Sequence, residues 1–284
     1  MIPFLHAEQH IRKMRGRSQA HLIRASNGAF YVVKFQNPYS PRILANEMLA
    51  TQIGLWLGLP LPTIDPIEVS AWLIQNTPEL RVQVDGAEYP CRSGLHLGSR
   101  YPFHPVHERA EIYDHLPESQ LTKLADPLSF ARVMVLDKWL GNTDGRQAIF
   151  VRKRRARLFN ALFIDHESCF DAGRWAFPDL PFHGVYHQNY VYEQVTGWKS
   201  FEPALTKAET ASFIDLWRFG QMIPPEWYGQ DSDGLRQLVE TVYERWRRIR
   251  HLIEAFRRSE GNPFPNWKDA TPIPPDEIDL EENQ

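Results

Sequence analysis

The sequence predicts an α+β protein with two lobes, the first rich in β-strands and the second mainly helical. Two runs of strand-forming residues flank Asn27 and Gly28 within residues 20–35. This pattern is typical of a β-hairpin, because both turn residues tolerate positive φ angles. Most of the periodic patterns in the second half of the sequence are helical. We therefore expect an N-lobe over residues 1–77 and a helical C-lobe over residues 78–260.

A helix should follow this hairpin. Ser40 can cap it, Pro41 suits its first position, and Gly58 followed by Pro60 ends it. Residues 65–76, with the sequence DPIEVSAWLIQN, then predict one or two strands. The N-lobe is therefore predicted as a hairpin, a helix and further strand.

The C-lobe is predicted to begin its helical part at residues 126–141, between an Asp-Pro start and a Gly stop. Residues 147–165 then predict two short strands. The basic segment Arg152–Arg157 joins them, and we interpret it as a solvated turn.

Two longer helical patterns lie near the end of the chain. Thr206 and Glu209 have the spacing of a capping box at the start of a helix over residues 206–220. Residues 235–258 place their apolar side chains on one helical stripe. The tail over residues 261–284 is rich in proline and acidic residues, so we expect it to be extended.

The composition is that of an ordinary globular protein, with 43% hydrophobic and 24% charged residues. A net charge of −3 argues against a nucleic-acid partner. Cys91 and Cys169 form no metal-type or redox-type motif, which suggests a reducing compartment. No signal-peptide pattern is visible, and the apolar run over residues 48–62 is too short to cross a bilayer. We expect a cytoplasmic protein with no membrane partner.

Two aspartates stand at the boundaries between predicted elements. Asp144 lies between Gly141 and Gly145, where the backbone can bend sharply and approach a ligand. Asp165 ends the apolar run LFNALFI, which predicts a buried strand. A hairpin between the two would bring the carboxylates together. Such a pair suits phosphoryl transfer, in which one carboxylate orients the acceptor hydroxyl and takes its proton while the other holds Mg²⁺ against the phosphates.

The other parts of such a site precede this corner. Lys34 lies in the strand pattern YVVKF, and Glu47 lies 13 residues later on the predicted helix. A strand lysine that orients phosphates, steadied by a helix glutamate, is the arrangement found in kinases. Gly16, Ser18 and Gln19 lie on a turn before the first strand, where backbone N–H groups can cover phosphates.

These segments together resemble the HipA-like kinases, which are distant relatives of the phosphatidylinositol 3/4-kinase fold. The resemblance rests on RGRSQA, YVVKF, NEMLATQIGLWLGLPLP, GNTDGRQ and FIDHESCF. It implies a two-lobed protein-kinase-like fold with ATP between the lobes. It also implies Lys34 as the phosphate-binding lysine, Asp144 as the catalytic aspartate and Asp165 as the metal ligand. The implied reaction transfers phosphate to serine or threonine, usually on a protein substrate.

The corner departs from the family pattern Asn-x-Asp-Arg-His-x-x-Asn. Asn142 and Asp144 fit, and we assign both to the catalytic loop. Gly145, Arg146 and Ile149 occupy the next three marked positions. An isoleucine offers no metal ligand, so the second contact to the metal must come from elsewhere.

Three residues could supply the missing oxygen: Gln147, Asn160 and Glu167. Gln147 is the first choice because it is the first amide after the catalytic aspartate. Longer family members carry an additional N-terminal subdomain, so we expect this chain to be a compact version with the kinase domain alone.

Two alternatives to a protein kinase remain open. Small-molecule phosphotransferases place two aspartates with similar logic, and nothing in the sequence identifies the acceptor. Ile149 at the metal position also fits a pseudokinase that binds nucleotide or protein without transferring phosphate. The sequence leaves the oligomeric state open.

Overall fold

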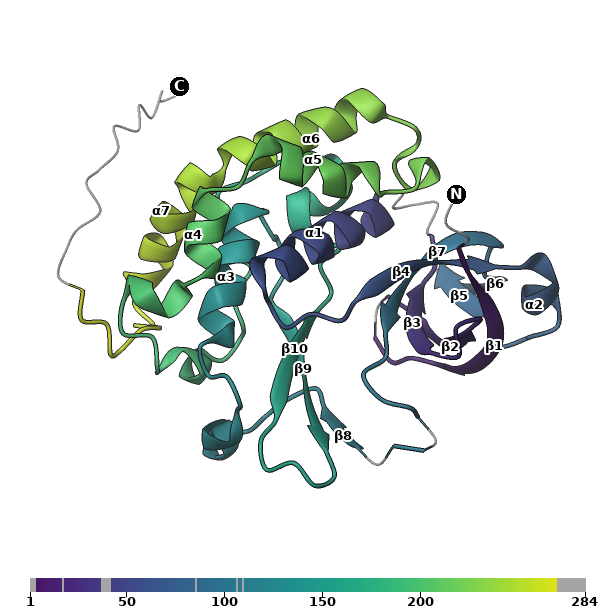
Figure 1. Cartoon of the computed structure of the whole chain (residues 1–284), viewed down its shortest axis with the longest axis horizontal. Coiled ribbons are helices and arrows are strands. Elements are labelled where there is room, and N and C mark those ends of the chain that lie inside the picture. Colours follow the sequence, from purple (N-terminus) through teal and green to yellow (C-terminus); the bar gives the residue numbers. More distant parts are fainter. Residues whose placement is uncertain are drawn as a thin grey trace.

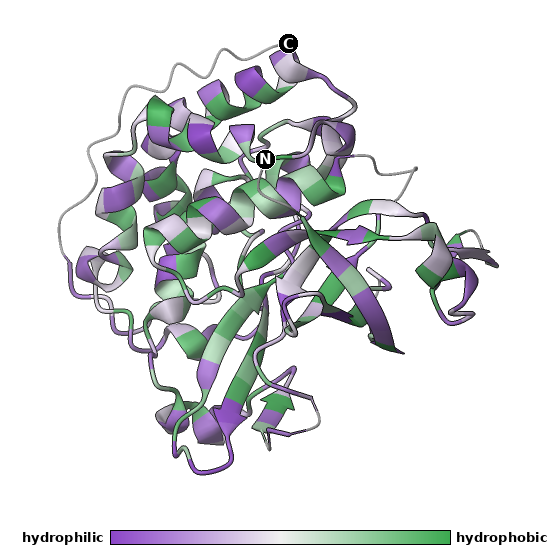
Figure 2. Ribbon diagram, turned by 45° about the vertical axis from the view of Figure 1, so that its right-hand side comes forward, coloured by the Kyte–Doolittle hydropathy of each residue, from purple (hydrophilic) through white to green (hydrophobic). Residues whose placement is uncertain are grey.

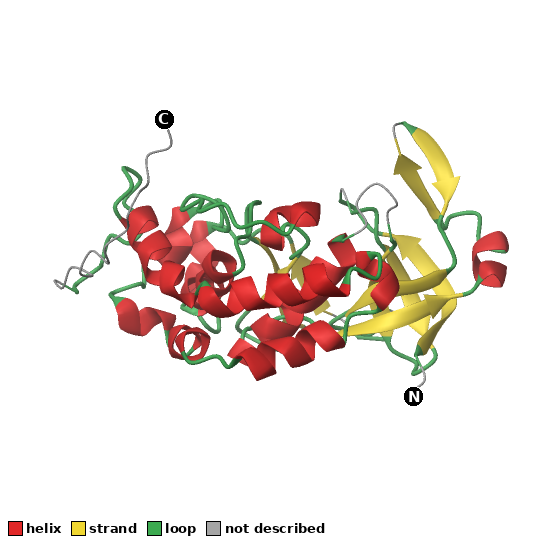
Figure 3. Ribbon diagram, turned by 90° about the horizontal axis from the view of Figure 1, so that it is seen from above, coloured by secondary structure: helices red, strands yellow, loops and turns green. Residues whose placement is uncertain are grey.

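The structure is a computed structural model that describes residues 4–16, 18–36, 42–84, 86–105, 107–108 and 110–269. Most strands gather at one end of the molecule and most helices at the other (Figures 1 and 3). The α1 helix lies between the two parts (Figure 1). The result is a mixed α and β architecture, as the sequence predicts.

A closed five-stranded barrel forms the strand-rich end (Figure 1). Its order is β1-β2-β3-β7-β4, with β1 parallel to β4 and the other neighbours antiparallel. The strands are β1 (Leu5–Lys13), β2 (His21–Ala25), β3 (Phe30–Lys34), β4 (Ile64–Val69) and β7 (Gly94–Arg100). The predicted hairpin is confirmed as β2 and β3, with Gly28 at a φ of +76° in the turn.

The helix α1 (Ile43–Leu57) follows the hairpin. It ends at Gly58, whose φ of +86° is the left-handed conformation that glycine adopts easily, so the predicted stop is confirmed. The predicted cap at Ser40 and Pro41 lies outside the described residues. Most of the side chains of α1 are buried, because the helix contacts the barrel on one side and other helices on the other.

Residues 65–76 were predicted to form only strands, but the second half of this segment is helical. After β4, Ser70 accepts a hydrogen bond from the backbone N–H of Leu73 (3.1 Å) and starts the helix α2 (Ala71–Gln75). A separate hairpin, β5 (Arg81–Val84) and β6 (Ala87–Pro90), precedes β7. The barrel thus includes β7, which lies beyond residue 77. The predicted boundary between the two lobes at residue 77 stays a prediction.

The chain then enters the helical part through β8 (Ala110–Tyr113) and α3 (Ser129–Trp139). The predicted strand pair over residues 147–165 is confirmed as β9 (Gln147–Lys153) and β10 (Asn160–Ile164). Antiparallel pairing aligns Gln147 with Ile164, so the base of this hairpin brings together the two ends that flank it.

The pattern over residues 206–220 forms two helices instead of one. These are α4 (Ala204–Glu209) and α5 (Phe213–Gln221), and Ser212 caps the second by accepting from the N–H of Asp215 (3.1 Å). The predicted capping box is wrong, because Glu209 lies at the end of α4 and pairs with Arg250.

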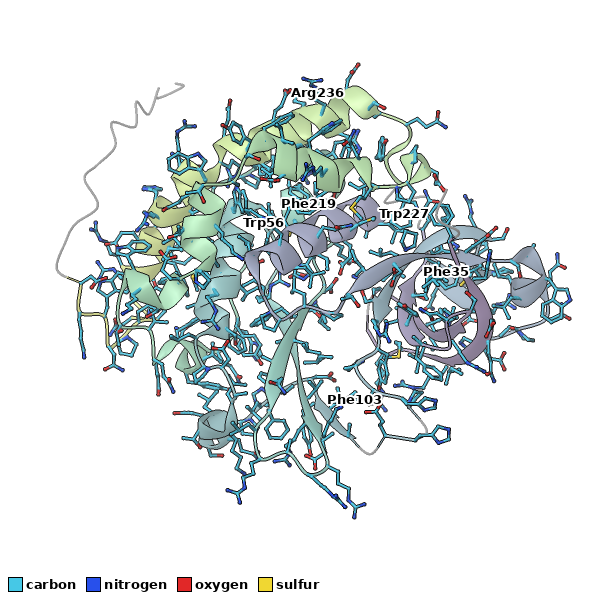
Figure 4. All side chains as sticks on the ribbon, in the orientation of Figure 1. Phe35, Trp56, Phe103, Phe219, Trp227 and Arg236 are labelled. Atoms are coloured by element: carbon cyan, nitrogen blue, oxygen red, sulfur yellow. The ribbon has the colours of Figure 1, made fainter. Side chains whose placement is uncertain are left out.

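The last helical pattern forms α6 (Ser232–Glu244) and α7 (Trp246–Arg257). Hydrophilic and hydrophobic residues alternate along these helices (Figure 2), as expected for helices that cover a core. Trp227, labelled in Figure 4, lies in the short 3₁₀ helix η5 (Pro225–Tyr228) and donates to the carbonyl of Leu95 in β7 (3.0 Å). This buried contact links the helical part to the barrel.

The beginning of the tail packs against the helical part, where Phe264 is buried and Asp269 accepts a hydrogen bond from the N–H of Trp198 (2.7 Å). Residues 270–284 lie outside the described part of the chain. Among the described residues, no helix combines the length and apolar composition that a membrane span requires.

Candidate functional site

One lysine and three carboxylates form a cluster between the barrel and the helical part. The Nζ atom of Lys34, at the end of β3, lies 3.0 Å from Glu47 Oε2 on α1. It also lies 2.6 Å from Asp165 Oδ1 and 3.0 Å from Glu167 Oε2, both just after β10. The predicted contact between Lys34 and Glu47 is therefore confirmed, and the cluster joins residues that are up to 133 positions apart.

Burial and charge set the protonation states in this cluster. Burial opposes the positive charge of Lys34, but the three carboxylates outweigh it and raise the pKa of the ammonium above its ordinary value. Burial would raise the pKa of Asp165, yet the ammonium of Lys34 outweighs this and holds that pKa below its usual range. Lys34 is thus charged and Asp165 is ionised, which are the states that their predicted roles require.

The backbone around Asp165 is fixed in an uncommon conformation. Asp165 has a φ of +65°, in the left-handed region that non-glycine residues rarely adopt. The next residue, His166, donates its backbone N–H to Glu47 Oε2 (2.7 Å). Strained backbone conformations are concentrated at functional sites. Here the left-handed backbone of Asp165 directs its carboxylate toward Lys34.

The catalytic loop of the prediction follows α3 and is built around Asn142. Its Nδ2 atom donates to Asp137 Oδ1 (2.9 Å), and its Oδ1 atom accepts from the N–H of Asp144 (3.1 Å). Asp144 in turn accepts from the N–H of Gly145 through Oδ1 (2.8 Å). Asn142 therefore orients the backbone that carries Asp144. The catalytic roles of both residues stay predictions.

A buried ion pair beneath this loop was not anticipated from the sequence. Arg146 donates to both oxygens of Asp137, at 2.9 Å and 2.5 Å, and neither side chain is more than 1% exposed. Its Nη1 atom also donates to the carbonyls of Ile164 (2.8 Å) and Asp165 (3.3 Å). The sequence signal for this pair is an aspartate inside the otherwise apolar segment VMVLDKWL. Arg146 thus connects the catalytic loop to the backbone of the predicted metal ligand.

The three candidates for the missing metal contact lie in different places. Gln147 donates from Nε2 to Asp165 Oδ2 (2.7 Å), and Glu167 belongs to the lysine cluster. Asn160 pairs with Val151 at the opposite end of β10, so it lies away from Asp165. Gln147 as a metal ligand stays a prediction, with Glu167 as its neighbour in the site.

The donor set suits a hard divalent cation. One oxygen from each of Glu47, Asp165 and Glu167 lies within 4.8 Å of the others. Carboxylate oxygens are the ligands that Mg²⁺ prefers. Three carboxyl groups face a single ammonium, and burial raises the pKa of Glu47, so a cation bound among them would favour the ionised form of Glu47.

The predicted phosphate loop lies between β1 and β2. Gly16 has a φ of +120°, and Gln19 donates its N–H to the carbonyl of Gly16 (3.3 Å). The side chain of Gln19 is bonded to the backbone of Gln83, through Nε2 to the carbonyl (2.7 Å) and Oε1 to the N–H (2.6 Å). Ser18 is exposed. The loop is therefore held by the β5–β6 hairpin, and its role in binding phosphate stays a prediction.

Comparisons with known proteins bear on the family and the fold of the chain. A model of the family described as HipA-like kinase matches residues 8–259. The Helicobacter pylori proinflammatory kinase CtkA is similar in structure, with a TM-score of 0.51 at 12% identity, covering 86% of this chain and 99% of that one. At this identity, the similarity indicates a shared kinase fold.

Other solved structures are more weakly similar. The Golgi casein kinase with Mn/ADP bound has a TM-score of 0.49 at 12% identity, covering 91% of this chain and 74% of that one. Hydra Fam20 with sugar has a TM-score of 0.48 at 12% identity, covering 91% and 86%. No curated protein sequence matches the chain. Because the family model spans most of the sequence, the chain belongs to the HipA-like kinase family.

Proposed function

We propose that this protein is an ATP- and Mg²⁺-dependent phosphotransferase that phosphorylates serine or threonine on protein substrates. Family membership supports a kinase. The observation that carries the proposal is the contact of Lys34 with both Glu47 and Asp165, since these come from a strand, a helix and the end of a strand that lies 131 residues from Lys34. A lysine that binds phosphates, a glutamate that holds it and an aspartate that binds metal meet in this way in kinases.

Each residue has one task in this proposal. Lys34, held by Glu47, contacts the phosphates of the nucleotide, and Asp165 together with Gln147 or Glu167 holds the metal. The metal supplies neutralisation of the charge that develops on the phosphates. Asp144 orients the acceptor hydroxyl and takes its proton. Asn142 fixes the backbone of Asp144 through its hydrogen bond to the N–H.

A nucleotide-binding protein without transfer activity is the second candidate, and one observation favours it. Ile149 stands where the family pattern has an asparagine, and it pairs with Leu162 within the β9–β10 hairpin. It offers no ligand atom, so the second metal contact depends on residues outside the family pattern. A small-molecule acceptor and a cytoplasmic location also stay open as proposals.

The test compares transfer of the γ-phosphate of labelled ATP with nucleotide binding by thermal shift, in the wild type, Asp144→Asn and Asp165→Asn. Both variants remove a charge with little change in shape. Asp144→Asn should retain Mg²⁺-dependent ATP binding and lose about 10²- to 10⁴-fold in transfer rate, as expected for loss of a general base. Asp165→Asn should lose both, because the metal loses a charged oxygen.

Asp114→Asn is the matched control, because it removes the same charge at an exposed position after β8. It should behave as the wild type in both measurements. Wild-type transfer rates in the Asp144 and Asp165 variants would refute the proposed site. ATP binding by a wild type that transfers nothing, to protein or small-molecule acceptors, would favour the second candidate.

A further inference from the structure

A tight turn stands beside the predicted catalytic loop. The N–H of His183 donates to the carbonyl of Leu180 (3.2 Å), which closes a turn over Leu180–His183. Pro181 occupies the second position, where its fixed φ favours such a turn, and Phe182 occupies the third. We refer to these four residues as the 180–183 turn.

A buried lysine holds this turn from beneath. Lys138, at 2% exposure, donates from Nζ to the carbonyls of Pro181 (2.9 Å) and His183 (2.5 Å). These two carbonyls lie on either side of Phe182. Two hydrogen bonds from one buried donor therefore hold the backbone on both sides of Phe182 in place.

The next residues bind directly to the loop that carries Asp144. The N–H of Gly184 donates to the carbonyl of Asp144 (2.8 Å), and the N–H of Arg146 donates to the carbonyl of Val185 (2.9 Å). Gly184 has a φ of +63°, and a Cβ there would lie 2.6 Å from Asp137 Cβ. Only glycine fits this close approach, which keeps the 180–183 turn next to the catalytic loop.

The segment is also anchored before the turn. Asp179 accepts from Arg245 (3.1 Å) and from Nε of Arg248 (2.9 Å). Fixed points on both sides mean that the turn cannot easily fold its apolar side chains inward.

Two large apolar side chains project from this fixed segment. Leu180 is 37% exposed and Phe182 is 59% exposed. Burying a side chain of this size is worth about 1.5–3 kcal/mol, so leaving it in water on a rigid backbone forgoes stability. Leu180 and Phe182 therefore place exposed apolar surface next to the loop that carries Asp144.

We propose that the 180–183 turn docks an apolar side chain of a protein substrate beside the serine or threonine that the site phosphorylates. This inference rests on the proposed function. An apolar side chain is the chemistry that Leu180 and Phe182 can recognise, since neither offers a hydrogen bond or a charge. The substrate class is therefore a polypeptide segment with a large apolar residue close to the acceptor hydroxyl.

The experiment measures phosphate transfer to a peptide library in which the acceptor is fixed and each neighbouring position is varied in turn. The wild type should select a large apolar residue at a position near the acceptor. For the selected peptide and its alanine counterpart, the ratio of kcat/KM should be about tenfold, the scale expected for partial burial of one such side chain. In Phe182→Ala and Leu180→Ala this ratio should fall toward one, through KM.

Ile214→Ala is the matched control, because Ile214 is 66% exposed on α5. It should keep the wild-type ratio. Phe182→Leu, which keeps an apolar side chain, should retain most of it. A wild type with no apolar preference, or a ratio unchanged in Phe182→Ala, would overturn the docking role while leaving the kinase assignment intact. A wild type that transfers phosphate to no acceptor would instead overturn the proposed function and this inference with it.

Discussion

Replacing Arg146 by methionine should destabilise the protein strongly. The change keeps much of the side-chain volume but removes both hydrogen bonds to Asp137 and the donors to the carbonyls of Ile164 and Asp165. The side chain of Asp137 is 0% exposed, so its carboxylate would remain buried without a counter-charge. Breaking a buried ion pair in this way costs about 3–5 kcal/mol.

Asn142 still donates to Asp137 in this variant, which places the expected loss at the lower end, about 3 kcal/mol. For a chain of this size, that corresponds to a fall in Tm of roughly 6–12 °C. Urea denaturation followed by circular dichroism measures the unfolding free energy directly. The double variant Asp137→Leu/Arg146→Met should recover part of the loss, because no unpaired charge remains.

Arg236→Met is the matched control. Arg236, labelled in Figure 4, pairs with Glu240 on the surface of α6, where the two side chains are 64% and 51% exposed. Such a pair contributes at most about 0.5 kcal/mol. The reasoning is wrong if Arg146→Met proves as mild as Arg236→Met, or if the double variant is less stable than the single one.

Three further outcomes follow from the same region. Lys34→Met should abolish Mg²⁺-ATP binding in a thermal-shift assay. Burial raises the pKa of Glu47 and the ammonium of Lys34 opposes that rise, so without Lys34 the folded variant should hold the proton of Glu47 to higher pH and lose stability relative to wild type as the pH rises above the ordinary range of a glutamate; a constant difference would contradict this. Gly184→Ala should lower both the unfolding free energy and the rate of phosphate transfer. Gly28→Ala has a similar positive φ but no atom within 4 Å of its Cβ, so it should lose only about 1–2 kcal/mol of stability through backbone strain. Equal losses of stability in the two variants would show that the close approach at Gly184 is not the cause. Burial lowers the pKa of Lys138 to about 7, so between about pH 7 and 10 the lysine is protonated in the unfolded state but neutral in the folded state. The unfolding free energy of the wild type, compared with that of Lys138→Met, should therefore rise by up to about 1.4 kcal/mol per pH unit in this range. A difference that does not change with pH would contradict the lowered pKa.

Local patterns and their order made much of the architecture predictable. Glycine at positive φ marks both the turn of the first hairpin at Gly28 and the end of α1 at Gly58. The contact of Lys34 with Glu47 was expected because a strand lysine followed by a helix glutamate is the arrangement found in kinases. The order of the elements made that comparison possible.

Other features depend on contacts that no local pattern encodes. The parallel pairing of β1 with β4 joins strands about sixty residues apart and closes the barrel. The break between α4 and α5 arises because Ser212 caps the second helix, a choice that competes with an equally good helical periodicity. The ion pair of Arg146 with Asp137 was not predicted for a similar reason. An arginine after a turn usually faces solvent, and only the fold places Asp137 beside it.

The ion pairs of Lys34 hold the barrel and the helical part together. They connect the barrel to Asp165 and Glu167, across 131 and 133 residues of chain. Immobilising a flexible side chain on binding costs about 0.5–1.5 kcal/mol, and ordering a loop adds to this. Here these side chains are ordered during folding, because the ammonium of Lys34 lies among the three carboxylates and holds the barrel and the helical part in position. If the protein binds ATP as proposed, the nucleotide would meet a site that is already assembled, and its phosphates would replace carboxylate oxygens as partners of one lysine.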